Sequence, residues 1–195
     1  MPKIITEKKT MKFLSLFVLL FLSFNLQCAA QSKVNGDFHI SLYQNSFGQI
    51  SEFEMFTKMD NQQVFFGLSC TDMSPFPTVQ IILMDKAILS TLSINYLDID
   101  YTILNSKQKP IPLTASLKST YKNDKFSNKI RLEINTGNIK SMTTIQKRYQ
   151  QLIAQLKQGS TIQINISSEK LDEETYQFSL KGLPALLAPH EALCR

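Results

Sequence analysis

Alternation of apolar and polar residues, repeated along most of the chain, is the feature that most constrains its fold. Residues 63–70 (QVFFGLSC), 97–104 (LDIDYTIL) and 129–135 (KIRLEIN) all alternate with a period of two. That period is typical of a half-buried strand, with one face on a core and the other in water. Residues 78–84 (TVQIILM) are apolar on both faces, which favours a central strand.

One segment has the periodicity of a long amphipathic helix, residues 143–158 (TTIQKRYQQLIAQLKQ). Its apolar side chains recur at helical spacing and form a single stripe. We expect Thr143 or Thr144 to cap its start and Gly159 to form a left-handed cap at its end.

The last part of the chain predicts a hairpin from residues 160–167 and 175–181, then a short helix over residues 184–193. Residues 86–96 fit either a short helix or a strand. Strands do not alternate with helices, which disfavours a parallel α/β fold. The predicted class is α+β, mostly β: an antiparallel sheet or sandwich with one amphipathic helix and a short C-terminal helix.

The N-terminus has the features of an export signal. Residues 13–26 are an apolar run after Lys12, and Cys28-Ala29-Ala30 resembles a cleavage site. We expect residues 1–30 to be a signal peptide, and residues 31–195 to form a single mature domain in the periplasm or outside the cell.

Three alternatives to this processing stay open. Met11 could be the true start of the chain, because Met11-Lys12 makes a compact signal peptide by itself. The apolar run could be retained as an anchor, although it is short for a membrane span. Cys28 could carry a lipid, although Gln27 is not the small residue that usually precedes a lipidated cysteine.

Removal of residues 1–30 would leave two cysteines, Cys70 and Cys194. In an oxidising compartment they have one possible pairing. Cys70 continues the inward face of its strand, and the terminal helix before Cys194 needs a sheet to cover its leucines. We expect a Cys70–Cys194 disulfide; the alternative is two buried thiols.

The formal net charge of +5 does not indicate nucleic-acid binding, because residues 1–30 contribute +3 of it. One local basic stretch remains, which predicts either an anionic partner (a lipid headgroup, an acidic protein face or a glycan) or simply a solvated hairpin loop. It consists of Lys118, Lys122, Lys125, Lys129 and Arg131, with Tyr121 and Phe126 between them.

Thirteen phenylalanines and no tryptophan mostly indicate core residues. Several of them lie in the first third of the chain and could leave an exposed apolar patch. These are Phe47, Phe53, Phe56, Phe65 and Phe76.

No set of residues predicts catalysis, a cofactor or a metal. The two histidines, His39 and His190, lack metal-ligand spacing. A nucleophilic pair of Cys194 and His190 is less favoured than a disulfide. Asp98 and Asp100 lie on one face of a strand about 7 Å apart, but such residues usually face water.

The final fifty residues resemble small exported proteobacterial proteins, namely the type VI secretion accessory protein VasI and the invasion-associated locus B family. The likeness lies in a helix ending LIAQLKQGSTIQI and a closing stretch YQFSLKGLPALLAPHEALC, with the early strand QVFFGLSC. It implies an exported, non-enzymatic β-rich domain tied by a disulfide.

We therefore expect an exported, non-enzymatic binding or accessory protein of the bacterial cell envelope or a secretion system, with another protein of that apparatus as partner. The alternative is a periplasmic immunity or inhibitor protein directed against a toxin or a cell-wall enzyme.

Overall fold

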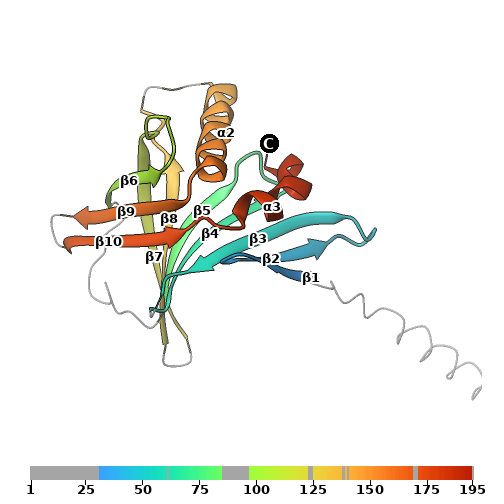
Figure 1. Cartoon of the computed structure of the whole chain (residues 1–195), viewed down its shortest axis with the longest axis horizontal. Coiled ribbons are helices and arrows are strands. Elements are labelled where there is room, and N and C mark those ends of the chain that lie inside the picture. Colours follow the sequence, from blue (N-terminus) through green and yellow to red (C-terminus); the bar gives the residue numbers. More distant parts are fainter. Residues whose placement is uncertain are drawn as a thin grey trace, which may run out of the picture.

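The computed structural model describes residues 31–60, 62–84, 97–122, 125–137, 139, 141–168 and 171–194. The predictions for the signal peptide, Met11, Cys28 and residues 86–96 lie outside these residues. The described part consists of two antiparallel sheets and a small helical layer (Figure 1). The predicted class, α+β and mostly β, is confirmed.

The larger sheet has seven strands, and all neighbouring strands are antiparallel. The first strand is polar and exposed along its whole length, so the sequence pattern does not reveal it. In sheet order the strands are β1 (Gln31–Asn35), β2 (Phe38–Gln44), β3 (Ile50–Lys58), β4 (Val64–Thr71), β5 (Thr78–Met84), β8 (Lys125–Ile134) and β7 (Leu113–Lys122).

The smaller sheet has three strands in the order β10 (Leu171–Ser179), β9 (Thr161–Ser168) and β6 (Asp98–Leu104). The predicted hairpin is confirmed as β9–β10, although β10 begins four residues earlier than expected. A single bridge from Leu97 to Ala115 joins the start of β6 to β7 of the larger sheet.

The helices are α2 (Met142–Gln158), α3 (Leu183–Leu187) and the 3-10 helix η1 (Ala188–Leu193). The predicted cap residue at the start of α2 is wrong, whereas Gly159 does cap its end but not in the predicted conformation. Its N-cap residue is Ser141, with no capping hydrogen bond from its side chain. Gly159 has φ −77° rather than a left-handed conformation. Glycine is needed there for space, because a Cβ atom would lie 2.1 Å from Cγ2 of Ile103.

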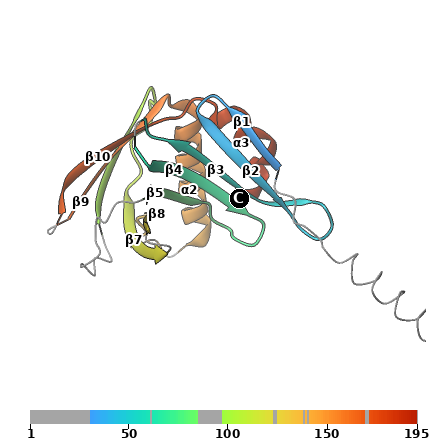
Figure 2. The same cartoon turned by 90° about the horizontal axis from the view of Figure 1, so that it is seen from below.

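The core lies on one face of the seven-stranded sheet, the inner face, which α2, α3 and the smaller sheet cover. The rings of Phe66 in β4 and Phe178 in β10 pack with centroids 5.6 Å apart. The ring of Phe53 in β3 packs on His190 of η1 at 6.1 Å. The other face of the sheet, the outer face, is covered by neither α2 nor α3 (Figure 2).

Candidate functional site

The outer face of the larger sheet is the strongest candidate for a binding site. Strand register places alternate residues of neighbouring strands side by side on it. One row runs from Phe56 through Gly67, Gln80 and Arg131 to Ser116. The next row along the strands contains Lys58, Phe65, Ile82, Lys129 and Lys118.

A groove of about 480 Å³ lies between these rows, within the size range of ligand sites. Its lining combines apolar side chains with lysines, a mixture that suits a partner with both apolar and anionic groups. The lining residues are Glu54, Met55, Phe56, Gln63, Phe65, Gly67, Leu68, Ser69, Gln80, Ile82, Met84, Lys125 and Lys129.

Aromatic rings form part of the groove wall and are already packed against one another. Phe56 stacks on His39 of β2, with centroids 5.4 Å apart and planes at 7°. On its other side, Phe56 meets Phe65 edge-on at 6.1 Å. Both phenylalanines are half-buried. Rings held in this way lose little side-chain entropy when a partner covers them.

Gly67 leaves the middle of this wall without a side chain. A Cβ atom built there would point between Phe56 and Gln80 and would lie 3.2 Å from the carbonyl oxygen of Met55. Glycine inside a strand weakens it, and often marks a place where another group approaches closely. Here the missing side chain contributes to the hollow.

The predicted basic stretch lies on the β7–β8 hairpin beside this groove. The strand register pairs Lys118 with Lys129, and Lys122 with Lys125. Lys129 and Lys125 line the groove, and Lys118 is exposed next to them. Arg131 has an acidic neighbour, because its Nε lies 3.1 Å from the Glu133 carboxylate.

Negative charge lies at the opposite side of the groove, on β3. Glu54 accepts a hydrogen bond of 3.2 Å from the hydroxyl of Tyr43. Partial burial, followed by the nearby Glu54 carboxylate, raises the pKa of Tyr43 above its usual value. The groove is thus electrostatically polar, with cations on β8 and an anion on β3.

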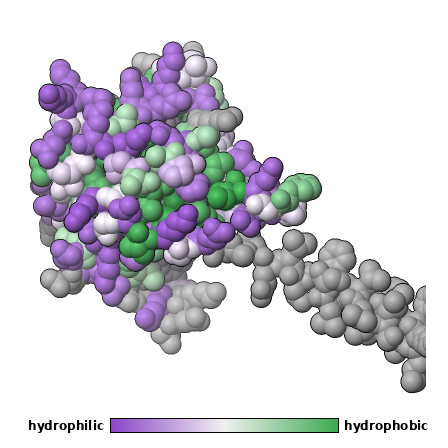
Figure 3. Space-filling view, turned by 45° about the vertical axis from the view of Figure 1, so that its right-hand side comes forward, coloured by the Kyte–Doolittle hydropathy of each residue, from purple (hydrophilic) through white to green (hydrophobic). Residues whose placement is uncertain are grey.

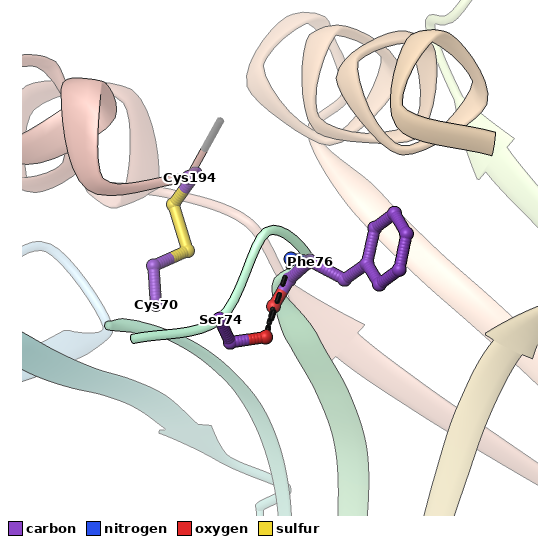
Figure 4. Close-up of a disulfide and its surroundings, with 4 residues drawn as sticks. All are labelled: Cys70, Ser74, Phe76 and Cys194. Atoms are coloured by element: carbon purple, nitrogen blue, oxygen red, sulfur yellow. Dashed lines mark hydrogen bonds between the residues drawn. A yellow bond between two sulfur atoms is a disulfide. The ribbon is translucent and has the colours of Figure 1, made fainter. Parts of the chain in front are cut away.

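The predicted disulfide is confirmed. Cys70 at the end of β4 is bonded to Cys194, with Cα atoms 5.1 Å apart and a sequence separation of 124 (Figure 4). Both cysteines are buried. Because Cys194 is bonded, it supplies no free thiol for a pair with His190.

The loop after Cys70 is held between the disulfide and α2 (Figure 4). The hydroxyl of Ser74 donates to the carbonyl oxygen of Phe76 at 2.9 Å, and Phe76 N–H donates back at 3.2 Å. The Phe76 ring packs 5.3 Å from that of Tyr149 in α2. A second hollow of about 490 Å³ lies beside this loop and has no basic residue in its lining.

The other residues considered for catalysis are not brought together. Asp98 and Asp100 are exposed on β6, and one Asp100 oxygen accepts the backbone N–H of Tyr101 at 2.9 Å. His39 lies on the outer face, whereas His190 packs on the inner face. No group of three or more metal-ligating side chains occurs within the described ranges.

The five early phenylalanines separate into different environments. Phe53 is fully buried, Phe76 packs on α2, and Phe47 is 85% exposed in the β2–β3 turn. Only Phe56 and Phe65 line the groove. Viewed from another side, the molecule has hydrophobic residues interspersed with hydrophilic ones (Figure 3). Apolar side chains next to lysines, rather than apolar surface alone, therefore distinguish the outer face.

The groove itself is not evident from the sequence. Phe56 and Phe65 were candidates for an exposed patch and Lys129 for an anionic site, but they lie far apart along the chain. The register across β3, β4, β5 and β8 brings them together. Gly67 carried a weak signal, as a lone glycine within an alternating strand.

Comparison with protein-family models, curated proteins and solved structures finds no match to this chain. Within the part of the chain that the structure describes, no helix has the length and apolar character needed to cross a membrane.

Proposed function

We propose that this chain is an exported, non-enzymatic binding protein of the bacterial cell envelope or a secretion system, and that another protein binds its outer face. The observation that supports this most is the groove on that face. Two packed aromatic rings line it, and aromatic side chains are enriched at protein interfaces. The lysines beside them favour a partner with negative charge at this place.

Export is supported by two independent features. The signal-like residues 1–30 precede the described domain, and the Cys70–Cys194 disulfide suits an oxidising compartment such as the periplasm. The likeness of the C-terminal residues to VasI and the invasion-associated locus B proteins points to the same class.

Export is tested by expressing the full chain in a Gram-negative host and measuring the intact mass in each cell fraction. We expect a periplasmic or secreted form that begins at Gln31. An uncleaved chain in the cytoplasm would contradict export. A diacylglycerol on Cys28 would replace cleavage after Ala30 with lipid anchoring.

Binding at the outer face is tested with a photo-cross-linking amino acid at Gln80, which lines the groove. The matched control places it at Thr102, which is exposed on β6 of the other sheet. We expect a discrete cross-linked protein from position 80 and none from position 102. The reverse pattern, or none at either position, would contradict the proposal.

A further inference from the structure

Two lysines on the outer face stand opposite each other without an acidic partner. Lys118 and Lys129 are register partners on β7 and β8, and both are exposed. Neither has an ion pair or a side-chain hydrogen bond with any residue that the structure describes. Like charges directly opposite on neighbouring strands destabilise a hairpin. An anion placed over the pair would remove that cost.

We propose that the protein partner presents an acidic segment to this face, with carboxylates against Lys118 and Lys129 and an apolar side chain over Gly67. This inference rests on the proposed function and specifies the partner's chemistry. The apolar side chain over Gly67 would pack against Phe65 and Ile82, which lie in the neighbouring row together with the two lysines.

The shape of the site favours a protein segment over a small amphiphile. The groove is a hollow on a sheet face rather than an enclosed cavity, so a single acyl chain would stay largely in water, whereas small-molecule sites bury most of their ligand. The outer face also continues past the groove to the His39–Phe56 stack. From β2 to β7 it spans about 24 Å at the usual strand spacing, which is wide enough for a protein interface.

The charges also predict how the partner is oriented. Arg131 is already neutralised in part by Glu133, so at the β7–β8 side of the face the exposed lysines without an ion pair among the described residues are Lys118 and Lys129. Glu54 lies on the far side of the groove, on β3. Carboxylates of the partner should therefore lie over β7–β8, and its neutral or basic side chains over Glu54.

The test uses the purified, disulfide-bonded protein and a displayed library of random peptides of about twelve residues as the probe. Peptides that bind wild-type protein are sequenced and synthesised with a fluorophore, and their affinities are measured by anisotropy. We expect enrichment of Asp and Glu next to an aromatic or aliphatic residue. Raising the ionic strength to about 0.5 M should weaken binding.

Three test variants and one matched control show where the peptides bind. Lys118→Glu/Lys129→Glu should weaken the selected peptides by about tenfold or more. Its matched control, Lys107→Glu/Lys147→Glu, changes two exposed lysines elsewhere and should alter affinity by less than about twofold. Gly67→Val fills the hollow and should weaken binding as strongly as the double reversal. The Cβ of Gly67→Val would lie 3.2 Å from the carbonyl oxygen of Met55, so a second variant, Ile82→Glu, tests the same hollow without this contact. Thermal unfolding verifies that each variant folds.

The inference is overturned if the library gives no binders or if the binders are not enriched in Asp and Glu. It is also overturned if Lys118→Glu/Lys129→Glu binds the selected peptides as tightly as wild type. Direct binding of laurate but not of dodecanol, with no peptide binding, would replace the acidic segment with a small anionic amphiphile. If position 80 cross-links a protein that binds Lys118→Glu/Lys129→Glu as tightly as wild type, only the acidic segment is wrong and the proposed function stands.

Discussion

Gly159 follows α2 at a point where the end of the helix lies close to Ile103 of β6 and to Leu180, the residue after β10. Its backbone conformation is one that any residue can adopt. A methyl group there would lie 2.1 Å from Cγ2 of Ile103 and 3.0 Å from Cδ1 of Leu180. Since Cγ2 sits on a β-branched carbon in a strand, it has little room to move.

Gly159→Ala should therefore destabilise the protein by about 1–3 kcal/mol through overpacking, measured by denaturant unfolding. The control is the double variant Gly159→Ala/Ile103→Ala. Because Ile103→Ala removes the clashing methyl, the double variant should lose less stability than the sum of the losses of the two single variants. Strictly additive losses would show that the contact with Ile103 is not the cause.

Thr57 on β3 is a polar residue inside the core. Its side chain is completely buried, and its hydroxyl has no hydrogen-bond partner among the residues that the structure describes. Thr57→Val keeps the shape and removes the unsatisfied hydroxyl, so we expect a gain of about 1–2 kcal/mol in unfolding free energy. Thr102→Val, on the exposed side of β6, should change stability by less than about 0.5 kcal/mol. A loss of stability in Thr57→Val would mean that the hydroxyl is bonded after all.

At the scale of elements, one buried hydrogen-bond network joins β6, α2 and the loop after β6. The Tyr101 hydroxyl donates to Oε1 of Gln155 in α2 at 3.1 Å and accepts the N–H of Ile111 at 2.7 Å. Gln155 in turn donates from Nε2 to the carbonyl oxygen of Lys109 at 2.8 Å. The network accounts for Gln155, a buried amide in the apolar stripe of α2.

Tyr101→Phe should cost about 1–3 kcal/mol, because it leaves Ile111 N–H and a Gln155 oxygen unsatisfied in the core. Urea unfolding near pH 7 measures the loss. Tyr43→Phe is the matched control: it removes a hydroxyl bonded to an exposed carboxylate and should cost less than about 0.5 kcal/mol. Equal losses in the two variants would contradict the role of the buried network.

The same tyrosine predicts a pH dependence. Burial raises the pKa of Tyr101, and the nearby Asp100 adds to this, while the hydrogen bond from Ile111 lowers it. A group whose pKa is higher in the folded state stabilises the fold below its unfolded pKa of about 10 and loses that contribution as pH rises. The stability difference between wild type and Tyr101→Phe should therefore shrink above about pH 10. A constant difference to higher pH would contradict this.

Most of the elements could be predicted from period and composition, because strands β4, β5, β6 and β8 and the helix α2 each have a clear apolar pattern. The polar β1 could not, since it is held by pairing with β2 and by contact of Gly182 with Asn35 rather than by its own side chains. Strand order could not be predicted either: β8 inserts between β5 and β7, and this follows from long-range packing. The groove shares that origin, which is why its residues could be predicted only as separate candidates.

At the scale of the whole molecule, the Cys70–Cys194 disulfide ties the end of the chain to the middle of the larger sheet. It closes a loop with a sequence separation of 124 residues, so its removal should release much chain entropy in the unfolded state. Cys194→Ser should lower the unfolding free energy by about 2–5 kcal/mol. Amide exchange should speed up in α3 and η1 first, while the strands stay protected. Reducing agent should produce the same loss in wild type and no further loss in the variant. Equal unfolding free energies for Cys194→Ser and oxidised wild type would contradict the stabilising role of the bridge.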